Sequence, residues 1–174
     1  MHTAPCNPSR FGQWLGVMLF AVAMAWIESA VVLYLRTRSQ QFDPYAPFQQ
    51  PLGADLLRAE MVREAATLVM LGSVGWLAGR TWRTRMALAI VAFGTWDIFY
   101  YIFLVPLTGW PRSLLDWDIL FLLPLPWWGP VLAPTLIACL MIAGGTLVAL
   151  RDSPERPISP SRYSLLTACS GGLL

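Results

Sequence analysis

Three carboxylic acids stand inside long apolar stretches of the sequence, where a charged group is costly. Glu28 is the one charged residue of the stretch 11–35, and Glu64 and Asp97 lie within two later apolar stretches. A carboxylate surrounded by hydrocarbon must find a counter-charge or a proton, so such residues mark ion paths, proton relays or ion pairs. These three acids are therefore the first candidates for chemistry.

Further polar and aromatic residues lie near these acids and complete a candidate pocket. Glu60 and Glu64 are four residues apart and Arg63 is three from Glu60, so a helix would place them on one face. The candidate ligand or ion-pair residues are Glu28, Arg58, Glu60, Arg63, Glu64, Asp97, Tyr100, Tyr101, Asp116 and Asp118.

Two interpretations of these residues are open. In the first, the clustered carboxylates bind a cation, relay protons or hold a polar headgroup. In the second, Arg63 pairs with Glu28 or Asp97, and the set only fixes the packing of the helices. Asp116 and Asp118 offer carboxylates for Ca²⁺, but a capped start of an interfacial helix is the simpler interpretation of that pair.

The scarcity of histidine excludes several kinds of chemistry. His2 is the only histidine and lies in the N-terminal tail, so this chain alone offers neither bis-histidine haem ligation nor a histidine-based metal site. A serine–histidine hydrolase is excluded for the same reason. The three cysteines are isolated and form no CxxC motif. We therefore assign no catalytic residue and no metal ligand, and the identity of any cofactor stays open.

The composition is that of a membrane protein. Hydrophobic residues make up 56% of the 174 residues and charged residues 13%, about half of the charged fraction in ordinary soluble domains. We predict an all-α, polytopic bundle of four transmembrane helices. The predicted segments are an N-terminal tail at 1–10, a bundle at 11–150 with spans at about 11–35, 55–79, 86–107 and 131–150, and a polar C-terminal tail at 151–174.

The segment 112–130 does not fit a regular span. Its apolar core is too short to cross a bilayer, and its three prolines, Pro124, Pro126 and Pro130, prevent a long helix. Tryptophans in and just before it favour a membrane–water interface. We predict a short helix followed by a Pro/Trp-rich re-entrant or interfacial segment that packs against the four spans.

The arginines predict an orientation, because short loops rich in arginine stay in the cytoplasm. With the N-terminus inside, seven arginines lie on the cytoplasmic side and three in external loops. The first set is Arg10, Arg80, Arg83, Arg85, Arg151, Arg156 and Arg162, and the second is Arg36, Arg38 and Arg112. Both termini are then cytoplasmic. The arginines form no basic stripe, which argues against nucleic acid as a partner.

This orientation brings the three buried acids to similar depths. At a rise of about 1.5 Å per residue, Glu28 and Glu64 lie about 12 and 13 Å below the outer ends of their spans, and Asp97 lies about 16 Å from the inner end of its own. All three then fall in the outer half of the membrane, with Arg58 and Arg63 as the available counter-charges.

Four motifs between residues 20 and 145 are distinctive: ESAVVLYLR, REAATLVML, WDIFYYIFL and GWPRSLLDWDILFLLPLPWWGPVLAP. They resemble a family of small, uncharacterised bacterial integral membrane proteins. The resemblance implies a location in the bacterial inner membrane and implies that the acids and the Pro/Trp-rich segment belong to one unit. That family has no assigned activity, so the resemblance implies none here.

Two functions follow from these observations as hypotheses. One is an accessory subunit of a larger bacterial membrane complex, with the lipid bilayer and other membrane subunits as partners. The alternative is a stand-alone membrane protein that binds or transports a cation, a proton or a lipid headgroup in an outward-facing acidic pocket. A membrane enzyme is a third hypothesis, and no motif in the sequence supports it.

Overall fold

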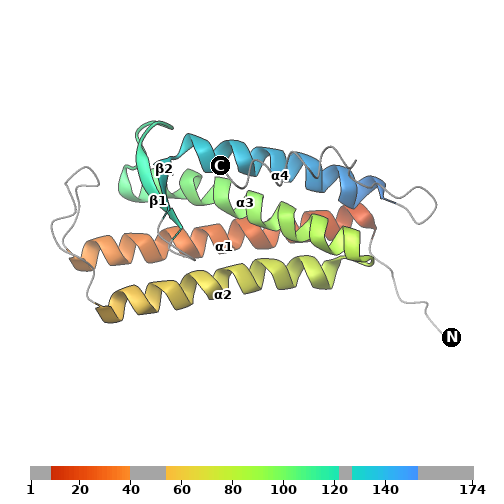
Figure 1. The fold of residues 1–174 in the computed structure, drawn as a ribbon, viewed down its shortest axis with the longest axis horizontal. Coiled ribbons are helices and arrows are strands. Elements are labelled where there is room, and N and C mark those ends of the chain that lie inside the picture. Colours follow the sequence, from red (N-terminus) through yellow and green to blue (C-terminus); the bar gives the residue numbers. More distant parts are fainter. Residues whose placement is uncertain (1–8, 40–53, 122–126, 153–174) are drawn as a thin grey trace.

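The computed structural model describes residues 9–39, 54–121 and 127–152, and within these ranges the chain forms four helices and one hairpin (Figure 1). The helices are α1 (Arg10–Ser39), α2 (Ala54–Ala78), α3 (Trp82–Thr108) and α4 (Leu132–Arg151), and the strands are β1 (Trp117–Phe121) and β2 (Trp127–Pro130). Each helix is long and apolar enough to cross a membrane. The four predicted spans are therefore confirmed as helices.

Helix α3 is the centre of the bundle and packs against each of the other three helices (Figure 1). Small residues such as Ala21 of α1 and Ala92 of α3 are fully buried in the core beside Leu71 and Trp96. Small side chains let helix backbones approach closely, and close packing is the main source of helix association in lipid. The side chains in the middle of α3 are thus fixed by three neighbours.

The contact between α3 and α4 requires a glycine at position 145. A Cβ atom there would lie 2.8 Å from the carbonyl oxygen of Ala87 and 2.7 Å from Cγ2 of Val91, whereas a Cβ at Gly144 would meet nothing within 4 Å. Any side chain larger than a hydrogen atom at position 145 therefore pushes the two helices apart. Position 144 has room for such a side chain.

We expect Gly145→Val to lower the free energy of unfolding by about 1–3 kcal/mol, because it overpacks a tight interface. Gly144→Val is the matched control and should change stability little. Thermal unfolding of both variants and the parent protein in one detergent measures the difference. An equal loss in the two variants would show that the α3–α4 packing is not as described.

Both ends of α3 are defined by local hydrogen bonds. Thr81 caps the start of the helix through a reciprocal pair with Thr84, and Gly109 ends the helix in the left-handed conformation with φ of 72°. Glycine adopts this conformation without a steric penalty. The turn leads directly to Trp110, which is buried.

The segment 112–130 differs from the prediction. In its described part the chain forms an antiparallel hairpin in which Asp118 faces Gly129, so the predicted short helix is wrong. Aromatic and β-branched residues such as Trp117 and Ile119 suit a strand, and β2 supplies the backbone partners. Pro130 ends β2, where proline is tolerated. Pro124 and Pro126 lie outside the described residues.

The two ends of the bundle differ in character. The hairpin lies at the end that contains the last turns of α1 and α3 and the first turns of α2 and α4, and we call this the hairpin end (Figure 1). At the opposite end, which we call the arginine end, Arg83 lies 4.0 Å from Asp152, and Arg10 donates to the carbonyl oxygen of Leu150 at 3.4 Å. The arginine end contains Arg10, Arg80, Arg83, Arg85 and Arg151.

Candidate functional site

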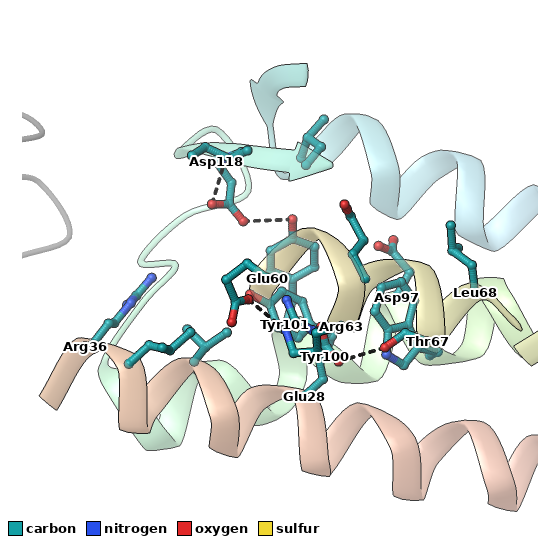
Figure 2. Close-up of a pocket in the computed structure, with 16 residues that line it drawn as sticks. Glu28, Arg36, Glu60, Arg63, Thr67, Leu68, Asp97, Tyr100, Tyr101 and Asp118 are labelled. Carbon is teal, nitrogen blue, oxygen red and sulfur yellow. Dashed lines mark hydrogen bonds and ion pairs between the residues drawn. The ribbon is translucent and has the colours of Figure 1, made fainter. Parts of the chain in front are cut away.

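A cavity of about 240 Å³ lies among α1, α2, α3 and β1, toward the hairpin end (Figure 2). Its polar lining comes from all four of these elements. Eight of the ten predicted site residues line it, namely Glu28, Glu60, Arg63, Glu64, Asp97, Tyr100, Tyr101 and Asp118. Residues that are as far apart in sequence as 28 and 118 are thus brought together at one place.

Arg63 joins α2 to α1 through a buried network of ion pairs. One Nη of Arg63 contacts Oε1 of Glu28, and its Nε donates to Oε2 of Glu60 at 2.7 Å. The hydroxyl of Thr67, one turn further along α2, donates to the other oxygen of Glu28 at 3.3 Å. Glu28 is 7% exposed. The sequence left open whether Arg63 would pair with Glu28 or with Asp97, and the structure shows the Glu28 pair.

Asp97 is buried and has no ion-pair partner among the described residues. Its side chain is 6% exposed, and its Oδ2 atom makes no hydrogen bond within the described part of the chain. Figure 2 shows its carboxylate pointing into the cavity. A buried carboxylate must gain a counter-ion or a proton, so the cavity next to Asp97 is the natural place for a positively charged or proton-donating group.

Aromatic rings form one wall of the cavity beside Asp97. The rings of Trp96 and Tyr100 are stacked with centroids 6.2 Å apart, and the Tyr100 and Tyr101 rings meet edge to face at 5.0 Å. All three residues line the cavity. Aromatic faces attract cations most strongly where water is excluded, so this wall complements the acids.

The hairpin closes the cavity through Asp118. The Tyr101 hydroxyl donates to Oδ2 of Asp118 at 3.2 Å, and the backbone N–H of Ile119 donates to its Oδ1 at 2.8 Å. Burial raises the pKa of Asp118 to about 6, although these two donors and the nearby charge of Arg36 act to lower it. Asp118 therefore changes charge just below neutral pH.

Arg36 is a cavity residue that the sequence did not single out. It was predicted to lie in an external loop, but α1 continues to Ser39 and keeps Arg36 on the helix. Its guanidinium lies 5.0 Å from the centre of the Trp110 ring, and the residue lines the cavity. Its place at the cavity could not be predicted from sequence spacing, because only the fold brings Trp110 next to its guanidinium.

Two predicted residues do not line the cavity. Arg58 is exposed on the first turns of α2 and lies 3.7 Å from Asp55. Asp116 accepts hydrogen bonds from the backbone N–H groups of Arg112 and Ser113 at 2.7 and 3.2 Å. Asp116 therefore stabilises the turn before β1, and only Asp118 of the predicted pair faces the cavity.

Thr67 also lines the cavity and was not among the predicted site residues. A signal for Thr67 existed, since it lies three residues after Glu64 and helix spacing puts both on one face.

The charges on the cavity wall are unbalanced. Five acids and two arginines line it, and the acids are Glu28, Glu60, Glu64, Asp97 and Asp118. Within residues 9–39, 54–121 and 127–152, no three acidic, histidine or cysteine side chains come close enough together to hold one metal ion. The acids thus surround a volume instead of converging on a point.

The fold and the cavity define the class of molecule: a bundle of four helices that are each able to cross a membrane, with an acidic and aromatic cavity at one end. Comparison of the chain with family models, with curated proteins and with solved structures finds no match. The function is therefore argued from the site itself.

Proposed function

We propose that this protein is a multi-pass membrane protein that binds a small organic cation in the cavity, with an ammonium group next to Asp97. The observation that carries the proposal is the Oδ2 atom of Asp97, which is buried, points into the cavity and makes no hydrogen bond within the described residues. An ammonium group would supply both the charge and the hydrogen-bond donors that this oxygen lacks.

The size and lining of the cavity favour an organic cation over a bare ion. A volume of about 240 Å³ exceeds the roughly 30 Å³ that one water molecule occupies in the liquid. Apolar side chains such as Val32 and Leu68 share the lining with Trp96, and they suit the hydrocarbon part of an amine. Pockets that combine a few placed polar groups with apolar walls are typical of small-molecule sites.

We further propose that the membrane is the bacterial inner membrane and that the arginine end faces the cytoplasm. The cluster of Arg80, Arg83 and Arg85 around the short turn between α2 and α3 supports this orientation, and the resemblance of the sequence motifs supports the bacterial origin. The cavity then opens toward the external side, where it would meet solutes from outside the cell.

An accessory role in a larger membrane complex is the second proposal. The large apolar side chains exposed on the helices, such as Leu77 of α2 and Leu140 of α4, suit helices of other subunits as well as lipid. Purification in a mild detergent tests this role, because an accessory subunit would retain other polypeptides and a stand-alone binding protein would not.

The test of cation binding compares three aromatic ligands of similar size and shape. Benzylammonium, benzyl alcohol and benzoate differ mainly in charge, and each is added to the full-length protein in detergent during thermal unfolding. Benzylammonium alone should raise the melting temperature, because ligands that bind only the folded state stabilise it. Equal shifts with all three ligands, or none with the amine, would contradict the proposal.

Binding of benzylammonium should weaken severalfold when the pH falls from 7.5 to 5. Asp118, with its pKa of about 6, is negatively charged above that pH and neutral below it, so acid removes one attraction for the cation. Titrations at a series of pH values measure the effect. Asp118→Asn should make the loss of binding between pH 7.5 and 5 smaller, and Asp116→Asn, two residues away in the turn, should leave it as in the parent protein. An unchanged profile in Asp118→Asn would exclude Asp118 as the titrating group.

A further inference from the structure

A second concave surface lies at the arginine end, far from the acidic cavity, in the groove between α2 and α3. Its volume is about 540 Å³. We call it the α2–α3 groove, and its principal residues are Val69, Gly72, Trp76, Trp82, Arg85 and Met86. None of these residues lines the acidic cavity.

The walls of the α2–α3 groove are apolar and open to the surroundings. Val69 is 66% exposed and Trp82 is 64% exposed. A Cβ at Gly72 would meet nothing within 4 Å, whereas one at Gly75 would collide with the backbone of Ala89. The two helices therefore touch at Gly75 and leave the space at Gly72 unfilled, so an apolar chain could lie against the exposed surface there.

Arg85 is held at the mouth of the groove with donors to spare. Its Nε donates to the carbonyl oxygen of Gly79 at 3.2 Å, and its guanidinium lies 4.4 Å from the centre of the Trp76 ring. Trp76 in turn meets Trp82 edge to face at 5.4 Å. This arrangement fixes the side chain, and within the described residues no acceptor binds its terminal nitrogens.

The charge at this end is strongly positive. Five arginines lie at the arginine end, and within the described residues Asp152 is the single acid there, with Arg83 4.0 Å away. An occupant of the groove must therefore combine an apolar chain with an anionic head. Clusters of arginine at the membrane surface favour anionic over zwitterionic lipids.

We infer that the α2–α3 groove binds an anionic phospholipid, with one acyl chain beside Gly72 and the phosphate on Arg85. The site requires only that the helices cross a membrane, and it does not depend on the proposed cation site. It would anchor the arginine end at the lipid headgroups and brace α2, which packs mainly on α3.

Native mass spectrometry of the delipidated full-length protein tests this site with phosphatidylglycerol and phosphatidylcholine of identical acyl chains. Phosphatidylglycerol should be retained in preference. Arg85→Gln should weaken its binding about fivefold, the loss expected for one arginine at a membrane surface. Arg112→Gln, an exposed arginine near the hairpin, is the control and should bind as the parent does.

A second variant keeps the test valid if Arg85→Gln fails to fold. Gly72→Leu leaves Arg85 in place and has room for its side chain, but it fills the groove and should displace the lipid. Equal retention of the two lipids by the parent protein, or unchanged retention of phosphatidylglycerol by Gly72→Leu, would overturn the inference. Dimers that are lost in Gly72→Leu while lipid retention stays unchanged would assign the groove to a second copy of the chain instead.

Discussion

Asp97→Asn is expected to weaken binding of benzylammonium by about ten- to a hundredfold, while the protein stays folded and as stable as the parent or more so. Hydrogen bonds to charged groups contribute about 1.5–3 kcal/mol, and this variant removes the charge that the ammonium group would meet. Stability should not fall, because Oδ2 of Asp97 makes no hydrogen bond within the described residues. Calorimetric titration and thermal unfolding of the same preparation measure both effects.

The matched control for this variant is Asp55→Asn. Asp55 is an exposed acid in the first turn of α2 and pairs only loosely with Arg58, so its replacement should leave binding unchanged. The combination of lost binding with retained stability separates a ligand-binding acid from one that only fixes helix packing. A clear loss of stability in Asp97→Asn would instead indicate a structural partner for this residue and would favour the packing interpretation.

Arg63→Gln should have the largest effect on stability, with a loss of about 3–5 kcal/mol. The substitution removes the counter-charge of Glu28 and Glu60 at once, and an ion pair that loses one partner leaves an uncompensated charge in a buried site. Unfolding by denaturant in one detergent gives the free energies, and the yield of folded protein in size-exclusion chromatography gives an independent reading.

The control for Arg63→Gln lies five residues earlier on the same helix. Arg58→Gln changes an exposed arginine, and exposed ion pairs contribute little to stability. The double variant Arg63→Gln with Glu28→Gln should recover part of the lost stability, because it removes the buried charge that the single variant leaves unpaired. If the double variant were less stable than the single one, Glu28 would have another essential partner.

Much of the fold could be predicted because hydrophobic stretches in a membrane protein leave few alternatives to a helix. The prediction that Glu28, Glu64 and Asp97 lie near one another also followed from helix geometry, since the rise per residue fixes their depth. Helix spacing could not decide which acid Arg63 would pair with, because that choice depends on how α1 and α2 rotate about their axes.

The hairpin could not be predicted for a different reason. A short apolar run such as 117–121 fits a buried helix as well as a strand, so its sequence pattern does not distinguish the two structures. The two acids differ because Asp116 precedes β1 and accepts hydrogen bonds from the turn, whereas Asp118 lies within β1 and faces the cavity. The position of Arg36 depended in turn on the extra helical residues at the end of α1, and helix ends are poorly defined by sequence patterns.

The most direct measurement of cation binding is the position of a bound amine in a crystal. Crystals of the full-length protein grown with 4-bromobenzylammonium would show the bromine by its anomalous scattering. If the proposal is correct, the crystal shows one bromine site, in the cavity, with the ammonium group beside Asp97 and the ring along Trp96 and Tyr100. A bromine peak elsewhere on the protein, or an unfilled cavity at saturating amine, would contradict it.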